Sequence, residues 1–278
     1  MGTSASSSGP GAGVPLVPSW VPDAVAADQP QPDGDQADGA VDGGAAATRQ
    51  PAELAPAGRF RGARTNLGKF GRTGSTRNLR RGVAQYTRKG LGGSARAAQR
   101  MGGTARKAGV LYGVLDSLSS GTASPVELGV DPQALSGKPA REAIDYIAEA
   151  ISPIDGTQDA EAARESVALA LAELVGQEPD TDLTSLTEDQ IRQVVESYIG
   201  NDIAKRIELD VGKAVFTKAP DAVTAVRRMG QLRRYVRQSV AASLRKLRHA
   251  GEPFSRQSAA RLAQRVIRDT FDVFEDYL

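Results

Sequence analysis

The sequence predicts an all-α protein, with a bundle-like helical body behind a disordered N-terminal tail and a Gly/Arg-rich, partly helical segment. From about residue 121 onward, apolar residues recur at every third or fourth position, the spacing of one buried helix face. Capping residues precede several of these stretches. No strand-like alternation of apolar and polar residues persists along the chain. We therefore expect about five to seven helices joined by short loops.

Residues 1–56 are the first of three predicted regions. They contain 8 of the 15 prolines, 8 glycines and a single aromatic residue, Trp20. A segment of this composition buries too little apolar surface to offset the entropy lost on ordering it. We expect a disordered tail, with an uncharged leader over residues 1–22 and an acidic tether over 23–56.

Residues 57–120 are the second predicted region, in which 13 glycines stand among 14 Lys and Arg residues. The glycines divide the segment into short periodic pieces. Thr76 and Ser94 are placed to cap two helices. Gly102 and Gly103 lie inside the second of these and weaken it by about 1 kcal/mol each relative to alanine. Small residues at that point allow another helix or a ligand to approach closely.

Residues 121–278 are the third region, an all-helical domain. Thr187 and Gln190 match a capping box, Pro220 suits the first turn of a long helix, and Ser255 is placed to cap the last helix. The expected apolar faces contain Ile144, Ile147 and Ile151; Val167, Leu171 and Leu174; Ile191, Val194, Val195, Tyr198 and Ile199; Ile203, Ile207, Val211 and Val215, as a separate short helix; Val223, Val226, Met229, Leu232, Val236, Val240, Leu244 and Leu247; and Leu262, Val266, Ile267, Phe271 and Phe274.

The net charge of +2 is the sum of three unequal blocks. Residues 1–56 carry 1 basic and 7 acidic residues, whereas 57–120 carry 14 Lys and Arg residues and 1 acid. Residues 121–278 carry 20 basic and 25 acidic residues. This asymmetry indicates either an anionic partner for the middle block or pairing between the blocks.

Several function classes lack the residues that they need. The chain has no cysteine, which excludes disulfides and thiolate chemistry. Its one histidine, His249, follows basic residues at a predicted helix end, where the helix dipole explains it. We expect no enzyme, and no catalytic residue, metal site or cofactor. The sequence holds no apolar run of membrane-spanning length and no secretory signal, so we expect a cytoplasmic protein without membrane contact.

The arginines of 57–120 are candidates for binding an anionic partner. Arginine in a Gly-rich context suits phosphate contacts, and Phe60, Phe70 and Tyr86 are interleaved where they can stack on bases. The favoured alternative is docking on an acidic protein surface, because 140–216 alone carry 17 acids against 6 bases. The candidate contacts to nucleic acid or to an acidic protein are Arg59, Arg61, Arg72, Arg80, Arg81, Arg88 and Arg100.

The leader begins with Gly2, whose small size favours removal of the initiator methionine and exposure of a glycine amine. One interpretation is a low-complexity leader, and another is the myristoylation pattern of GTSAS, although a single acyl chain anchors only marginally. A third is a peptide that threads into a partner's site with Trp20 as anchor, since flanking prolines favour an extended conformation. The residues assigned to partner binding are Thr3, Ser4, Pro15, Leu16, Val17, Pro18 and Trp20.

The leader, the tether and three short motifs together resemble a known family. The motifs are RFRGAR at 59–64, YTRKGLGG at 86–93 and AAQRMGG at 97–103. They are similar to the B component of the Qat anti-phage defence system, QatB, and the resemblance is clearest over 1–22 and 57–115.

The resemblance implies a bacterial operon that also encodes an ATPase, a QueC-like homologue of 7-cyano-7-deazaguanine synthase and a TatD-like nuclease. It implies that Gly2 is a modification site, to which the QueC-like partner couples a 7-deazaguanine acid with ATP. The helical body is then a scaffold for that partner and for the ATPase. The alternative function, a nucleic-acid-binding module that uses 57–115, stays open at this point.

Overall fold

In the computed structural model, all the regular elements of the described residues are helices, which confirms the predicted fold class. The disorder expected of 1–56 falls on residues that lie, with few exceptions, outside the described part. The residues that the structure describes are 16, 54–122, 129–135, 137–247 and 255–277.

The Gly/Arg-rich segment is more helical than the sequence predicted. Thr76 and Ser94 are the first residues of their helices and not the caps, because the N-cap positions are Ser75 and Gly93. The Ser75 side chain makes no capping hydrogen bond, and Gly93 has no side chain to make one. The helix expected to continue through Gly102 breaks at Met101, as the low helix propensity of two adjacent glycines favours. The elements are α1 (Arg61–Thr73), α2 (Thr76–Gln85), the π-helical turn η3 (Tyr86–Gly90), α3 (Ser94–Arg100) and α4 (Gly102–Ser120).

The C-terminal region confirms both predicted caps, Thr187 and Ser255. The side chain of Thr187 accepts a hydrogen bond from the backbone of Gln190, and that of Ser255 accepts one from the backbone of Ser258. Each pair forms a complete capping box. The helices are α6 (Pro132–Leu135), α7 (Ala140–Ile151), α8 (Gln158–Gln177), α9 (Glu188–Val211), α10 (Lys213–Lys218), α11 (Ala222–Leu247) and α12 (Arg256–Glu275).

Three predictions for the C-terminal helices were wrong. Pro220 precedes the first turn of α11, because this helix begins at Ala222 and the Asp221 carboxylate before it accepts a hydrogen bond from the backbone N–H of Thr224. Ile203, Ile207 and Val211 do not form a separate helix but continue α9, so this helix is longer than expected. Val223 and Val226 are exposed by 78% and 65%. The buried stripe of α11 instead starts at the small residue Ala225 and follows the helical spacing through Met229, Leu232, Val236 and Val240, which turns the two valines to the opposite side.

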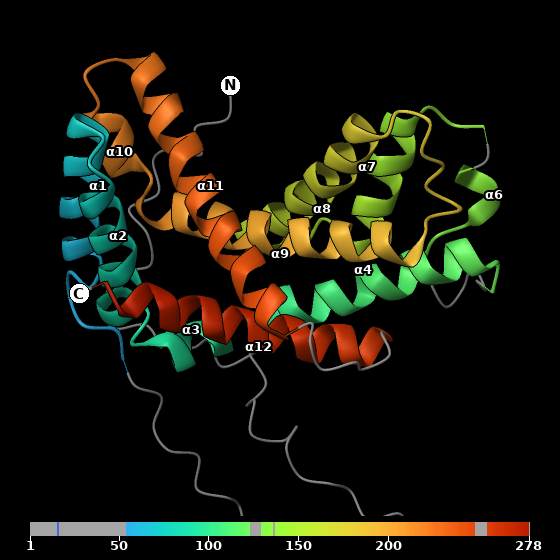
Figure 1. Cartoon of the computed structure of the whole chain (residues 1–278), viewed down its shortest axis with the longest axis horizontal. Helices are drawn as coiled ribbons and strands as arrows, with labels where there is room; N and C mark the ends of the chain where they lie inside the picture. Colours follow the sequence, from blue (N-terminus) through green and yellow to red (C-terminus); the bar gives the residue numbers. More distant parts are fainter. Residues whose placement is uncertain (1–15, 17–53, 123–128, 136, 248–254, 278) are drawn as a thin grey trace, which may run out of the picture.

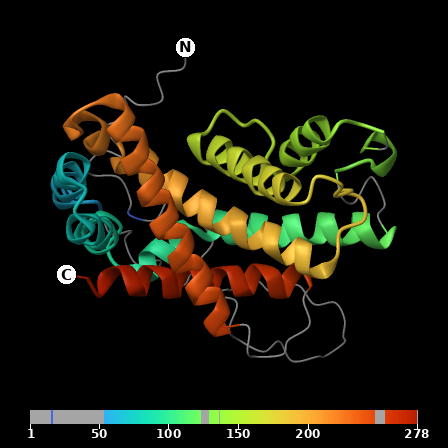
Figure 2. The same cartoon turned by 45° about the horizontal axis from the view of Figure 1, so that its top comes forward.

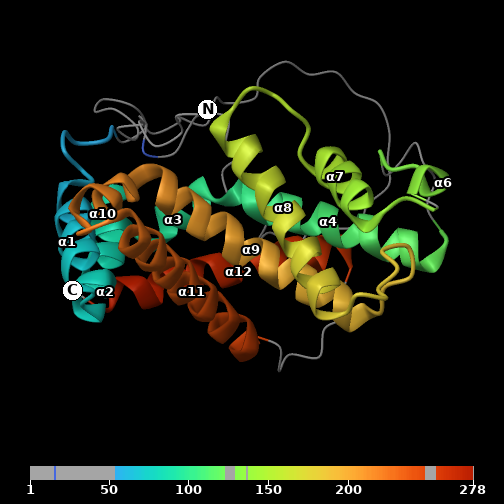
Figure 3. The same ribbon diagram turned by 90° about the horizontal axis from the view of Figure 1, so that it is seen from above.

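The helices form an elongated body with α9 at its centre. Helix α9 packs against α4, α8 and α11. Helices α1, α2 and α10 gather at one end, and α6 and α7 lie at the other (Figures 1 and 3). Helix α11 crosses the body and reaches α12 (Figure 2), which it also contacts. Within the described part, no helix has the length and apolarity needed to cross a membrane.

One continuous hydrophobic cluster runs from Phe60 in the Gly/Arg-rich segment to Phe274 in the last helix. The segment 57–120 and the helices after it therefore share a core. Close packing of α4 on α12 depends on Gly109, where an added Cβ atom would lie 2.6 Å from the carbonyl oxygen of Arg256. The close approach thus occurs at Gly109, whereas at Gly103, where the sequence predicted it, nothing lies within 4 Å of an added Cβ atom.

A buried polar network also joins the basic segment to the acidic region. The Thr104 hydroxyl on α4 donates a 2.5 Å hydrogen bond to Asp202 on α9. Asp202 is fully buried and pairs with Arg206 at 2.9 Å, and Arg206 also pairs with Asp159 on α8 at 2.8 Å. Burial alone would lower the pKa of the Arg206 guanidinium, but the two carboxylates raise it above its ordinary value. The Arg206 guanidinium is therefore held in its charged form.

Candidate anion-binding groove and leader contact

The strongest candidate site is a basic groove of about 760 Å³ between α1 and α10. Figure 1 shows these two helices at one end of the body. We call this site the α1/α10 groove. No acidic residue is among those that line it, and Ala214 is the one residue there with an apolar side chain. The lining residues are Gly58, Arg61, Arg64, Thr65, Gly68, Lys69, Arg72, Ala214, Thr217 and Lys218.

The glycines of α1 bring the two walls of the groove together. A Cβ atom added to Gly71 would lie 2.7 Å from the carbonyl oxygen of Val215, and one added to Gly68 would lie 3.1 Å from Cγ of Lys218. The contact at Gly71 leaves no room for a larger side chain, and at Gly68 the Lys218 side chain would have to shift by a few tenths of an ångström. The two small residues therefore set the distance at which cations from α1 and α10 face the same space.

The structure sorts the predicted arginines into different surroundings. Arg61 and Arg72 line the groove and are exposed. Arg80, Arg81 and Arg88 are also exposed but lie outside its lining, and the Arg80 guanidinium lies 4.9 Å from the ring centroid of Tyr277. The structure thus brings two of the predicted residues together.

Sequence reasoning missed part of the groove. Lys69 on the same helix and Lys218 on α10 both line it. The signal for Lys69 was available, because Arg61, Thr65, Lys69 and Arg72 recur at the spacing of one helix face. Lys218 carried no such signal, since only the tertiary fold brings α10 against α1.

The aromatic residues proposed to stack on bases are buried, which corrects that prediction. Phe60, Phe70 and Tyr86 expose 3%, 1% and 0% of their surface. Phe60 and Tyr86 stack on each other, with ring centroids 5.5 Å apart. Their apolar surface belongs to the core, where burial of a large ring stabilises the fold more than exposure would allow.

Arg59 lies in a buried polar cluster instead of on the surface. It exposes 5% of its surface, and none of its three guanidinium nitrogens has a hydrogen-bond partner. Burial, aided by nearby Arg100, lowers the pKa of the Arg59 guanidinium, whereas Asp210 and Tyr86 oppose the change. The Tyr86 hydroxyl donates a 2.9 Å hydrogen bond to Asp210, whose pKa is raised by burial.

The leader meets the helical body at Leu16. This side chain is 4% exposed, and an added Cβ atom on Gly92 would lie 3.0 Å from its Cδ1. Gly92 has φ +81°, a left-handed conformation that glycine adopts without strain. The other leader residues assigned to modification or partner binding lie outside the described residues; they are Gly2, Thr3, Ser4, Pro15, Val17, Pro18 and Trp20.

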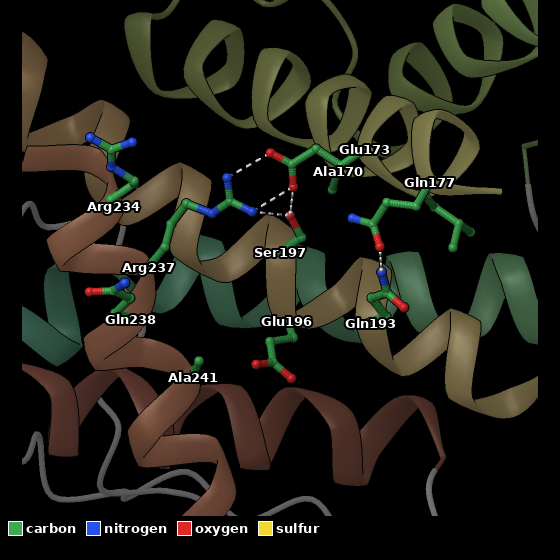
Figure 4. Close-up of a pocket in the computed structure, with 11 residues that line it drawn as sticks. Ala170, Glu173, Gln177, Gln193, Glu196, Ser197, Arg234, Arg237, Gln238 and Ala241 are labelled. Atoms are coloured by element: carbon green, nitrogen blue, oxygen red, sulfur yellow. Dashed lines mark hydrogen bonds and ion pairs between the residues drawn. The ribbon is translucent and has the colours of Figure 1, made fainter. Parts of the chain in front are cut away.

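A second pocket, of about 420 Å³, lies between α8, α9 and α11 (Figure 4). Arg237 donates two hydrogen bonds of 2.7 Å to Glu173, and the Ser197 hydroxyl donates to the same carboxylate. Gln193 donates a 2.9 Å hydrogen bond to Gln177. Because these groups satisfy one another, the pocket offers a ligand less than the α1/α10 groove does.

Among the described residues, no group of three or more His, Asp or Glu side chains is arranged to hold a metal ion.

The comparisons with known proteins identify the family. A family model described as Qat anti-phage system associated protein QatB matches residues 92–274, about two thirds of the chain. The match starts within the YTRKGLGG motif and covers the later helices, whereas the leader lies outside it. Curated proteins and solved structures gave no match. The chain therefore belongs to the QatB family and is a component of the Qat anti-phage defence system.

Proposed function

We propose that this chain serves the Qat system as a modification substrate and a scaffold, and not as a catalyst. The proposed acceptor is the amine of Gly2 after removal of the initiator methionine. The proposed donor is a QueC-like partner that attaches a 7-deazaguanine group. The helical body holds this partner, and the operon's ATPase and TatD-like nuclease are further proposed partners. Membership of the family supports this setting.

The observation that carries the proposal is the burial of Leu16 against the helical body. Leu16 contacts the position of Gly92, at the start of the region that the family model matches. Gly2 precedes Leu16 by 14 positions, and a fully extended chain of that length spans about 50 Å. A partner bound to the body near α3 would therefore have the amine within reach.

The chemistry suits a terminal glycine. An α-amino group has an ordinary pKa near 8, so a fraction of it is neutral and nucleophilic at neutral pH. Its attack on the carboxyl carbon of a 7-deazaguanine acid, activated with ATP, forms an amide bond; the amine loses a proton and the activating group leaves. Glycine has no side chain to obstruct entry into a narrow site.

Intact mass spectrometry of the chain co-expressed with the QueC-like partner tests the proposal. We expect the mass of the methionine-cleaved chain plus one deazaguanine acyl group. The matched control is Gly2→Glu, whose bulky second residue retains the methionine and blocks the acceptor. A methionine-cleaved wild-type chain without an adduct would sink the modification claim and leave the scaffold role to be judged by complex formation.

A further inference from the structure

We propose that the α1/α10 groove binds the phosphodiester backbone of a nucleic-acid duplex without reading its sequence. This inference goes beyond the proposed function and does not depend on it. It concerns the surface between α1 and α10 and a nucleic-acid ligand, whereas the proposed function concerns the amine of Gly2 and a QueC-like partner.

The charges of the groove match a repeating anion. Five cations line it, four of them from α1 and one from α10: Arg61, Arg64, Lys69, Arg72 and Lys218. From Arg61 to Arg72 the helix rises about 16 Å. One strand of a duplex places about five phosphates along that length, because its phosphates are spaced about 3.4 Å apart along the axis. A single small anion would engage only part of this row.

The uncharged lining residues also suit a phosphate backbone. Thr65 and Thr217 supply hydroxyl groups, which are common donors to phosphate oxygens. Gly58 and Gly68 carry no side chain that would obstruct a backbone ridge entering the groove. The arginine guanidinium groups can donate two hydrogen bonds to one phosphate.

The same lining argues against an acidic protein as the ligand. Protein interfaces gain most of their affinity from buried aromatic and apolar anchors. The groove has no aromatic residue in its lining, and its apolar surface comes from Ala214, the Thr methyl groups and the aliphatic stems of the Arg and Lys side chains. A protein partner would find charge there but no aromatic or large aliphatic residue in the lining to pack its anchor, whereas a phosphodiester backbone needs none.

The buried aromatic rings decide between single and double strands. Proteins that bind single strands without sequence preference stack the bases on exposed aromatic side chains. Phe60, Phe70 and Tyr86 are buried, and Phe216 on α10, which is 44% exposed, is not among the residues that line the groove. The lining therefore offers no aromatic face for stacking, and contacts to the backbone suit a duplex whose bases are already stacked.

Fluorescence anisotropy of a labelled mixed-sequence DNA duplex, titrated with the full chain, tests the inference. With five phosphate contacts, the slope of log K against log salt should be about −4.5, so affinity should fall by about five hundredfold between about 50 and 200 mM salt. Arg72→Gln and Lys69→Gln should each reduce the magnitude of the slope by about 1. Both residues are exposed, so the variants should keep the wild-type circular dichroism spectrum.

Arg81→Gln is the matched control, because Arg81 is an exposed arginine on α2 outside the groove lining. It should leave the slope nearly unchanged. Three results would overturn the inference: no duplex binding at about 50 mM salt, an equal loss in Arg81→Gln, or equally tight binding of an oligoglutamate of the same charge. Tighter binding of the single strand than of the duplex would overturn the assignment to a duplex. None of these results bears on the modification of Gly2.

Discussion

Leu16 packs against the position of Gly92, at the point where the leader meets the helical body. The gap is small enough that a Cβ atom on Gly92 would lie 3.0 Å from Leu16 Cδ1. Any residue larger than glycine at position 92 would therefore leave less room for the Leu16 side chain. Because the φ of Gly92 is +81°, such a substitution would also strain the backbone. The contact joins two parts of the chain that lie far apart in sequence.

Leu16→Ala should weaken this docking by about 2 kcal/mol, the lower end of the cost of truncating a buried leucine. Trp20, the chain's one tryptophan, lies four positions further on and reports the change. We expect the anisotropy of its emission to fall in the variant. Leu54→Ala is the control, because Leu54 is 59% exposed. Equal anisotropy in the wild type and in Leu16→Ala would show that the contact does not hold the leader.

Trp20→Ala should weaken the complex with the QueC-like partner, if Trp20 anchors the leader in that partner's site. Truncation of a central aromatic anchor typically costs about 2 kcal/mol or more, so the Kd should rise by at least about tenfold. Titration calorimetry of the two purified proteins measures this. An unchanged Kd would remove Trp20 as an anchor and leave the modification of Gly2 to be judged by mass.

Gly71→Ala should destabilise the protein by about 1 to 3 kcal/mol, because the new methyl group would meet the backbone of Val215 at 2.7 Å. Gly230→Ala is the matched control, since nothing lies within 4 Å of the added Cβ atom in the middle of α11. That change should instead stabilise by about 0.5 to 1 kcal/mol. Urea unfolding measures both, and equal effects would contradict the close packing of α1 on α10.

Asp202→Ala should lower the free energy of unfolding by about 3 to 5 kcal/mol. The reason is that the buried Arg206 would lose its ion pair with Asp202 and keep only that with Asp159. Asp202→Asn keeps an acceptor for the Thr104 hydroxyl and should cost less. Urea unfolding of the two variants provides the measurement. A loss below about 1 kcal/mol in Asp202→Ala would show that the network is dispensable.

Asp210 should make stability depend on pH in the direction opposite to that of an ordinary paired carboxylate. Burial raises its pKa, although Arg100, the Tyr86 hydrogen bond and Arg59 oppose the rise. The folded state then holds a proton that the unfolded state has lost. Its contribution to stability therefore falls as the pH rises from the ordinary Asp value, near 4, through the raised value.

Asp210→Asn removes this titration while keeping an acceptor for Tyr86. We expect the stability of the variant relative to the wild type to increase with pH across that window, followed by urea unfolding at several pH values. A difference that stays constant, or that decreases with pH, would contradict the raised pKa of Asp210.

Local sequence signals determined the helical class, the capping box at Thr187, the cap at Ser255 and the basic character of 57–120. Helix periodicity and capping depend on residues within one or two turns, so the sequence alone displays them. Family motifs in the leader and the Gly/Arg-rich segment also indicated the QatB family, which the family model confirms.

Only the tertiary structure decided which basic residues act together. It buried Arg59 and the three aromatic rings, turned Val223 and Val226 outward, and brought Lys218 beside α1. These outcomes depend on which helix faces meet, and that is set by packing between residues more than a hundred positions apart. Periodicity identifies the apolar face of a helix, but only the packing of the helices determines which other helix covers that face. The same packing determines which charged side chains lie together along a groove.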